Sequence, residues 1–230
     1  MFNPLPDLPK GHPHRPPPKA RRQARYLAGL YTLEELGLQL RRQAGQVGMN
    51  AAERWIGLSD GGNGFEEFLR SNFPGPVGGE LIIILDFWHA ADYLVELAKA
   101  LHPTEEETRQ GLVTAWCHTL KHVGGRRLLE DLQQLPLPPR KPAVRSQYET
   151  TLGYFQNNVH RMDDPTYKAN GWSIGSGSVE SACKTVVGQR LQLAGMRWGE
   201  PGTDKMCHLP ALLRSESTQW QLFWARQIRK

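Results

Sequence analysis

The segment ELIIILDFWHA, residues 80–90, decides the fold of this chain. Its apolar run Leu81–Leu85 is rich in β-branched residues and predicts a buried strand, which ends at Asp86. A helical pattern that includes His89 follows directly. Because functional groups of open parallel sheets gather at the carboxyl ends of the strands, Asp86 is a candidate functional carboxylate.

A second strand is expected upstream of this segment. The sequence ERWIGLSDGG, residues 53–62, has a short apolar run, Trp55–Leu58, that ends at Asp60 and two glycines. Residues 64–73, GFEEFLRSNF, lie between the two runs and predict a short amphipathic helix. A strand–helix–strand unit of this length favours parallel pairing. We therefore expect Asp60 and Asp86 to lie together at one edge of the sheet.

The segment 171–198, GWSIGSGSVESACKTVVGQRLQLAGMRW, places a lone carboxylate at the start of a basic helix. Its glycines and serines predict a turn, and Ser176 or Ser178 can cap the helix that follows. Glu180 lies in the first turn of that helix. It either complements the positive end of the helix dipole or acts as a catalytic carboxylate, and this segment alone leaves both interpretations open. The cations expected to contact a phosphate backbone are Lys184, Arg190 and Arg197.

Motifs along most of the chain resemble one family. They are LSDGG (58–62), FP (73–74), LDFWHA (85–90), YFQNNVHRM (154–162), GWSIGSGSVESACK (171–184), VGQR (187–190) and GMRW (195–198). In this order they resemble the bacterial insertion-sequence transposases of the ISKra family. These are relatives of the Mutator-like DDE transposases, whose catalytic fold is ribonuclease-H-like. Several long motifs in one order are more specific than a single short pattern.

The resemblance implies a role for each site residue. Asp60 matches the second catalytic Asp and Glu180 the closing Glu, and both would bind the Mg²⁺ or Mn²⁺ ions used for phosphoryl transfer on DNA. Asp86 and His89 match an Asp-x-x-His signature that supports the site rather than binding metal. The helices between His89 and Trp172 match the insertion that separates the second Asp from the Glu.

The first catalytic Asp of the family has no match in this sequence. It lies on the first strand of the fold, and no segment before residue 51 has a strand pattern. Asp7 is the only Asp there, and the prolines around it disfavour regular pairing. The expectation is the C-terminal portion of a transposase, with an α-rich α/β fold and a partial ribonuclease-H-like parallel sheet. It would be inactive or only weakly active alone and would bind transposon ends as a homo-oligomer or with the missing N-terminal portion.

The sequence divides into five parts. They are a disordered, basic, proline-rich tail (1–19), a helical segment (20–50), the strand–helix–strand–helix part of the core (51–101), a helical insertion (102–170), and the Glu180 helix with the C-terminal helices (171–230). Arg21, Arg22 and Arg25 extend the basic charge into the first helix, where they contact either solvent or phosphate.

Capping signals mark two of the expected helices. Thr32 and Glu35 have the spacing of a capping box, and so do Thr104 and Glu107, ahead of a helix that runs to His122. We expect the aromatic residues of the last helix to pack in the core and not to stack on nucleic-acid bases. These aromatic residues are Trp220, Phe223 and Trp224.

Composition favours an acidic partner. The net charge is +5 and the pI is about 9.2, which suits DNA. The three cysteines form no CxxC pair, and an odd number is typical of reduced thiols in a cytoplasm. No apolar run reaches the length of a membrane span, and no signal-peptide core is present. We expect a cytoplasmic, nucleoid-associated bacterial protein that does not enter the membrane.

Two other functions fit the same residues. A non-catalytic DNA-binding protein derived from a transposase would need only the basic residues. A metal-dependent nuclease would need a third carboxylate, from Asp86 or Asp163, although the sequence DDP (163–165) is also an ordinary turn.

Three remaining features do not indicate a functional site. Cys117, His118 and His122 share a predicted helix with zinc-like spacing, but packing or surface roles are preferred because no second ligand pair is present. Asp164 stands where the family pattern has an aromatic residue. Pro210 stands where the pattern has an Arg inside a helix, and proline is expected to shorten or kink that helix.

Overall fold

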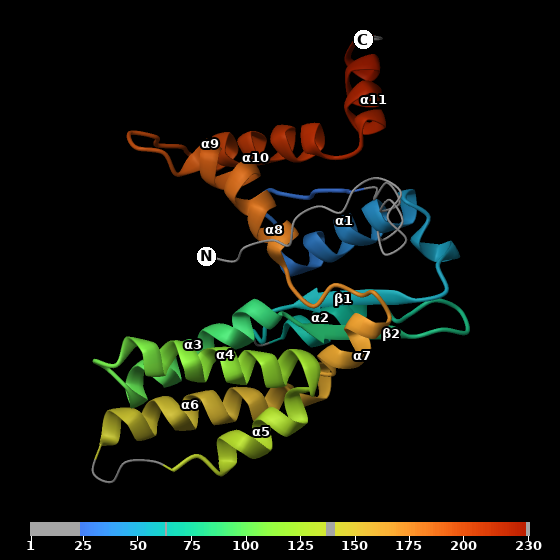
Figure 1. Ribbon diagram of the computed structural model, residues 1–230. Coiled ribbons are helices and arrows are strands. Elements are labelled where there is room, and N and C mark those ends of the chain that lie inside the picture. Colours follow the sequence, from blue (N-terminus) through green and yellow to red (C-terminus); the bar gives the residue numbers. More distant parts are fainter. Residues whose placement is uncertain (1–23, 63, 137–140, 229–230) are drawn as a thin grey trace, which may run out of the picture.

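The computed structural model describes residues 24–62, 64–136 and 141–228. A small parallel sheet lies between a body of long helices and an arm formed by the C-terminal helices (Figure 1). The described part of the chain is therefore an α-rich α/β structure, as predicted. The expected tail, residues 1–19, lies outside the described residues. Among the described residues, no helix has both the length and the apolar character needed to cross a membrane.

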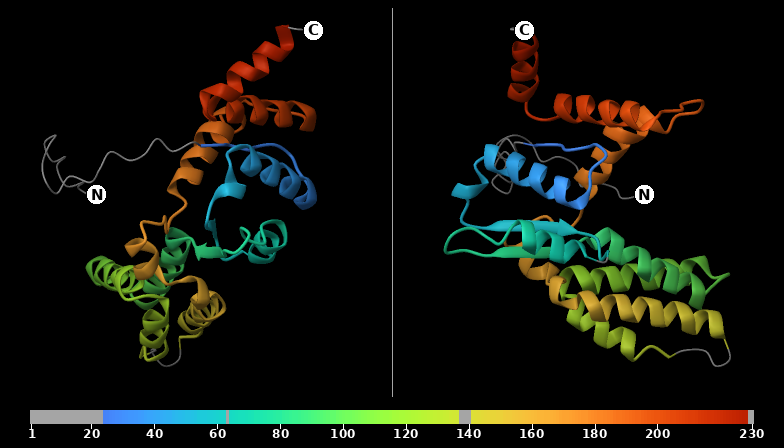
Figure 2. Two further views of the ribbon diagram at one scale, coloured as in Figure 1. Left: turned by 90° about the vertical axis from the view of Figure 1, so that its right-hand side faces the viewer. Right: turned by 180° about the vertical axis from the view of Figure 1, so that it is seen from behind.

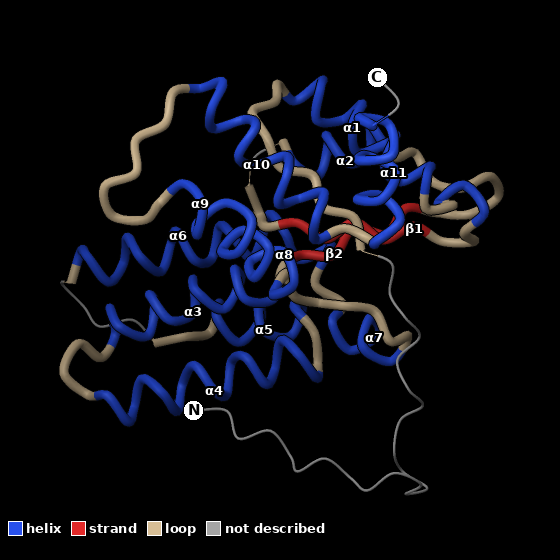
Figure 3. Tube along the Cα trace, turned by 90° about the horizontal axis from the view of Figure 1, so that it is seen from above, coloured by secondary structure: helices blue, strands red, loops and turns tan. Residues whose placement is uncertain are grey.

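The strand–helix–strand unit has the predicted order and direction. It consists of β1 (Trp55–Ser59), α2 (Phe65–Asn72) and β2 (Leu81–Leu85). The two strands pair in parallel, from Trp55 opposite Leu81 to Ser59 opposite Leu85. In the described part of the chain they form a sheet of two strands, which Figure 3 shows side by side among the helices.

Four helices form the body on one side of the sheet (Figure 2). They are α3 (Phe87–Leu101), α4 (Glu106–His122), α5 (Gly125–Gln133) and α6 (Pro142–Asn158). Their apolar faces bury a continuous core with the end of β2, and its fully buried members include Leu85, Leu94, Leu97, Leu128 and Phe155. Truncating one such Leu to Ala lowers the free energy of unfolding by about 2–5 kcal/mol. The packed helices therefore hold the end of β2 in place.

After α6 the chain returns to the sheet and then enters the arm. The return consists of the 3₁₀ turn η2 (Val159–Arg161) and α7 (Asp164–Ala169). The arm contains α8 (Gly177–Ala182), the π-helical turn η3 (Cys183–Gly188), α9 (Gln189–Leu191), α10 (Glu200–Arg214) and α11 (Ser217–Ile228). Figure 2 shows α10 and α11 on the side of the sheet away from the helical body.

Residues 24–32 are not helical, which corrects the expectation of a helix in the first part of segment 20–50. They run as an extended strap along α10. The guanidinium of Arg25 lies 2.6 Å from the carboxylate of Glu216, and the amide of Leu30 donates to Asp204 Oδ1 at 2.9 Å. Arg25 therefore binds within the protein rather than facing solvent or phosphate, while Arg21 and Arg22 lie outside the described residues.

The helix of this segment is α1 (Leu33–Gln46), followed by the 3₁₀ turn η1 (Met49–Ala51). The predicted capping box is confirmed, because the Thr32 hydroxyl accepts from the Glu35 amide while the Glu35 carboxylate accepts from the Thr32 amide. Helix α1 packs on α2, and this places it beside the sheet as Figure 1 shows.

The second predicted capping box is wrong. Helix α4 begins at Glu106, so that Glu105 rather than Thr104 occupies the cap position, and no side chain caps the free amides. The Glu105 carboxylate instead lies 3.2 Å from Nδ1 of His102. Glu105 thus contacts His102, and the cap that the Thr104–Glu107 spacing predicts is not formed.

The C-terminal helices correct two further expectations. Helix α10 runs through Pro210 to Arg214, so the proline does not shorten it, although its ring nitrogen donates no hydrogen bond. On α11 the ring of Trp224 packs 5.4 Å from Trp220 and 5.2 Å from Phe223, measured between centroids. Trp224 nevertheless stays exposed, because α11 projects from the arm instead of lying over the core.

Candidate active site at the carboxyl ends of the strands

The parallel register brings Asp60 and Asp86 to the same edge of the sheet. Ser59 pairs with Leu85 at the last position of the ladder, and the Asp86 amide donates to the Ser59 carbonyl at 2.8 Å. The two Asp residues are therefore the next pair in register. Asp60 is exposed, and its Oδ1 accepts from the Gly62 amide at 3.0 Å.

Asp86 is buried and fully engaged, at 5% exposure. Its Oδ1 accepts from the Trp88 amide at 3.2 Å, which caps α3, and from the Ser176 amide at 3.1 Å. Its Oδ2 accepts from the Ser176 hydroxyl. Because both oxygens already accept hydrogen bonds, Asp86 acts here as an anchor between α3 and the segment before α8.

Ser176 connects the buried Asp86 to the exposed Glu180. Its hydroxyl oxygen lies 3.3 Å from Glu180 Oε1 as well as beside Asp86. A hydroxyl has one proton, so it donates to one of these carboxylates at a time. The predicted capping role of Ser176 is corrected: it occupies the cap position of α8, but its side chain binds carboxylates instead of helix amides.

Two backbone contacts hold the segment that leads to Glu180. The Phe87 amide donates to the Ile174 carbonyl at 2.8 Å, next to the Asp86 contact. Gly175 lies so close to Trp88 that a Cβ on it would be 2.9 Å from the indole ring. A side chain at this position would require the exposed Trp88 ring to shift, and the turn that presents Glu180 is docked against the start of α3.

A buried guanidinium lies behind Asp60. Arg161 is 3% exposed, and its Nη1 donates to the hydroxyl of Ser59, the last residue of β1, at 3.3 Å. Its Nη2 donates to the Asn158 side chain, and its Nε lies 3.2 Å from Glu66 Oε2 on α2. The carboxylate of Glu66 also accepts from His160 Nε2 at 2.9 Å. This cluster joins β1, α2 and the end of α6, and it fixes the backbone that leads into Asp60.

His89 reaches the Asp60 turn through Tyr154. The Tyr154 ring stacks on Tyr93 at 3.9 Å, and the His89 ring packs edge-on against it at 5.9 Å. The Tyr154 hydroxyl is buried beside Gly61, and the described residues give it no well-aligned hydrogen bond. Burial raises the pKa of Tyr154, so the phenol stays protonated.

The three predicted DNA-binding cations are exposed on the arm. Lys184 lies in the π-helical turn, Arg190 in α9 and Arg197 in the loop before α10. The turn changes the register of the helix beyond Glu180, and such turns recur at functional sites. Glu180, Lys184 and Arg190 thus lie on one continuous helix, and Arg197 lies on the loop that follows it.

The carboxylate oxygens of the site are of the type that binds a magnesium ion, but among the described residues the site has too few of them. Asp60 and Glu180 are exposed carboxylates, which Mg²⁺ prefers. In the part of the chain that the structure describes, however, no group of three His, Cys, Asp or Glu side chains is spaced to hold a metal ion. Asp163 is exposed at the start of α7, so the DDP stretch begins a helix instead of forming a simple turn.

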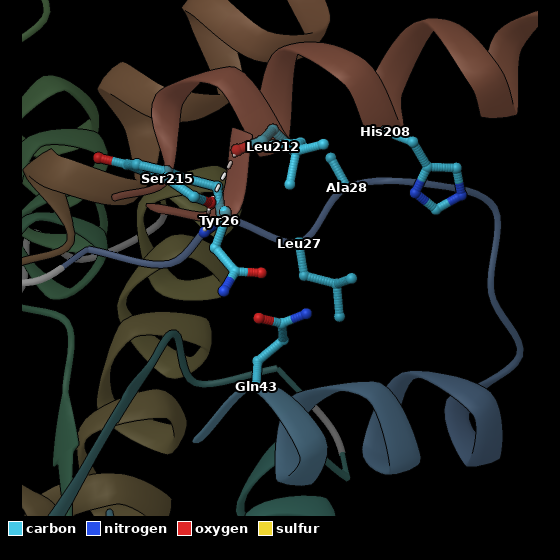
Figure 4. Close-up of a pocket in the computed structure, with 9 residues that line it drawn as sticks. Tyr26, Leu27, Ala28, Gln43, His208, Leu212 and Ser215 are labelled. Atoms are coloured by element: carbon cyan, nitrogen blue, oxygen red, sulfur yellow. Dashed lines mark hydrogen bonds between the residues drawn. The ribbon is translucent and has the colours of Figure 1, made fainter. Parts of the chain in front are cut away.

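A cavity lies elsewhere, between the strap, α1 and α10. Its volume is about 180 Å³, and Figure 4 shows Leu27, Gln43 and Ser215 around it. Beside it, His208 bridges the Tyr31 hydroxyl (3.2 Å) and the Asp204 carboxylate (3.1 Å). These bonds attach the strap to α10, so we assign them to folding and not to the strand-end site.

Sequence patterns located the carboxylates but missed their partners. Ser176 was expected to cap a helix, and neither Tyr154 nor Glu66 was singled out. The family resemblance placed His160 and Arg161 near the active centre, but no local pattern in the sequence indicated that Arg161 is buried and bonded to Ser59. No family model, curated protein or solved structure matches the chain.

Proposed function

We propose that this chain is the Asp- and Glu-bearing portion of a DDE-type DNA transposase with a ribonuclease-H-like core, similar to the ISKra insertion-sequence enzymes. One observation carries the proposal. Asp86 binds Ser176 through both carboxylate oxygens, and this ties the turn before Glu180 to the sheet edge where Asp60 lies. This link supports a shared site for Asp60 and Glu180, which are 120 positions apart in sequence, and two carboxylates in one site would suit metal-assisted phosphoryl transfer.

A third carboxylate is required for the full site. In the described residues β1 pairs with β2 on one side only, so its other edge is open to a further strand. We propose that such a strand, from another portion of the transposase or a second copy, brings the first Asp beside Asp60. Mg²⁺ or Mn²⁺ would then be held by that Asp with Asp60 and Glu180. Ion binding by this chain alone should be weak.

DNA is the proposed substrate. Lys184, Arg190 and Arg197 would bind phosphates next to Glu180, which places the carboxylate at the DNA backbone. A bacterial cell in which the protein associates with the nucleoid is the setting this implies.

A non-catalytic DNA-binding protein is the second candidate, favoured by the lack of a three-ligand group among the described residues. The nuclease with Asp86 as its third ligand is disfavoured, because both Asp86 oxygens are already engaged.

The test is strand transfer in vitro. A labelled duplex with the terminal sequence of the encoding element is incubated with supercoiled plasmid, Mn²⁺ and protein, and joined products are measured. We expect strong DNA binding and weak joining, with joining lost in Asp60→Ala and Glu180→Ala but kept in the control Asp92→Ala, which alters an exposed residue of α3.

Each alternative outcome has a distinct meaning. DNA binding without any joining, unchanged by Glu180→Ala, would support the non-catalytic candidate. Efficient joining that Asp60→Ala abolishes would show that no further strand is needed. Absence of DNA binding would refute both candidates.

A further inference from the structure

The loop between α9 and α10 is an exposed apolar tip on a basic arm. Residues 192–199 connect Leu191 to Glu200 and extend away from the rest of the arm in Figures 1 and 3. Three large apolar side chains of the loop face solvent: Leu193 (54% exposed), Met196 (39%) and Trp198 (44%). Apolar side chains gathered in this way on a projecting loop suit a partner that can cover them.

The tip is a formed turn. The Met196 amide donates to the Leu193 carbonyl at 3.1 Å, and Gly195 between them has a φ of +80°, which favours glycine. The Trp198 ring lies against the first turn of α10, where a Cβ on Gly202 would be 3.4 Å from it. The apolar side chains are therefore presented on a defined backbone before any partner binds.

The charge on the loop and the helix before it favours one class of partner. From residue 181 to residue 199 the charged side chains are Lys184, Arg190 and Arg197, all exposed, and the carboxylates Glu180 and Glu200 lie at the two ends of this segment. Cations beside exposed aromatic and thioether groups match a polyanion with apolar surfaces inside it. Duplex DNA has this chemistry, since phosphates flank stacked bases.

We propose that Trp198 and Met196 form a wedge that inserts between base pairs, while Arg190 and Arg197 bind the flanking phosphates. The inference rests on the proposed function and adds a second DNA contact to it. The helix from Glu180 to Leu191 spans roughly 17 Å at about 1.5 Å per residue. At about 3.4 Å per base pair, the wedge enters the duplex on the order of five base pairs from the phosphate beside Glu180.

The test uses DNA with 2-aminopurine, which fluoresces when it is unstacked. A set of 30-base-pair duplexes carries this base at successive positions, and protein binding is followed by both fluorescence and anisotropy. We expect a fluorescence rise at one or two adjacent positions. Trp198→Ala should abolish this rise and weaken binding about tenfold, since stacking of one base on an aromatic ring is worth ~1–3 kcal/mol.

The matched control is Trp224→Ala, which removes an equally exposed Trp (45%) from α11. It should leave both signals unchanged, and circular dichroism of each variant confirms folding. Binding and fluorescence of Trp198→Ala equal to wild type would overturn the wedge while leaving the proposed function intact. Trp198-dependent binding to anionic phosphatidylglycerol vesicles with none to duplex DNA would overturn both, and would assign the tip to a membrane surface.

Discussion

Replacing Asp164 by Asn is predicted to stabilise the protein at neutral and alkaline pH. Asp164 begins α7 and is 2% exposed, at the position where the family pattern has an aromatic residue. Burial raises the pKa of its carboxyl from 3.8 to about 7. The charge of Asp163 acts in the same direction, and Lys168 and Lys121 oppose it. Ionisation of this buried group therefore costs stability.

The linkage between ionisation and folding gives the sign and size of the change in the free energy of unfolding. The native pKa lies above the unfolded value, so the folded state binds the proton more tightly. The protonated Asp164 carboxyl makes its full contribution to the free energy of unfolding below pH 4, and this contribution is lost as the pH rises to about 7. At 1.36 kcal/mol per pKa unit the loss is at most about 4 kcal/mol.

The net gain from Asn is smaller than that limit. Removing a negative charge from the first turn of α7 costs about 0.3–1 kcal/mol in helix-dipole energy. The Asn amide also stays buried, and burying a polar group costs about 1–3 kcal/mol unless it is hydrogen-bonded. We therefore expect Asp164→Asn to raise the free energy of unfolding by roughly 2 kcal/mol at pH 8 and to change it little at pH 4.5.

Urea unfolding followed by circular dichroism at both pH values measures this difference. Asp92→Asn is the control, since it removes the same charge from an exposed site on α3 and should give a small, pH-independent change. A difference between Asp164→Asn and wild type that is the same at both pH values would refute the reasoning. A destabilised variant at pH 8 would show that the ionised carboxylate has a stabilising partner.

Three further substitutions test the strand-end site. Asp86→Asn removes the charge from three hydrogen bonds and should lower the free energy of unfolding by about 2–3 kcal/mol. Amide hydrogen exchange at residues 174–180 should become faster, and unchanged exchange there would contradict the anchor role. Gly61→Ala places a Cβ 2.9 Å from the Tyr154 hydroxyl and should cost about 1–3 kcal/mol in a thermal melt, whereas Gly153→Ala, in open space, should be neutral or stabilising. Arg161→Met should cost about 1–3 kcal/mol in urea, because it removes the hydrogen bonds of a buried guanidinium to Ser59 and Asn158 and its contact with the partly exposed Glu66, and a loss below 1 kcal/mol would argue against the cluster.

Much of the local structure was predictable because its causes are local. The run of three Ile residues before Asp86 and the short apolar run before Asp60 each indicate a strand, and the intervening amphipathic stretch indicates a crossover helix. The Thr32–Glu35 spacing correctly marked the start of α1. Parallel pairing and the shared edge for the two Asp residues follow from these patterns without any long-range information.

The errors share one physical origin. Thr104 has the spacing of a cap, and Ser176 stands before a helix, but competing partners changed the outcome at both positions. Residues 24–32 adjoin a helical pattern, yet they bind Asp204 of α10 and Glu216 just beyond it, about 175–190 positions away. The apolar pattern of α11 equally predicts burial, although in the described part of the chain Trp224 stays exposed.

The sequence by itself determined the strands, the crossover helix, the long helices of the body and the presence of an Asp after each strand. These depend on side-chain periodicity and on contacts within four residues. Only the tertiary structure decided that Asp86 is an anchor, that Arg161 lies buried behind Asp60, and that Ser176 links two carboxylates. Hydrogen bonds between groups some 90–100 residues apart leave no periodic signal, because the partner of a buried polar atom is set by the packing of the whole chain.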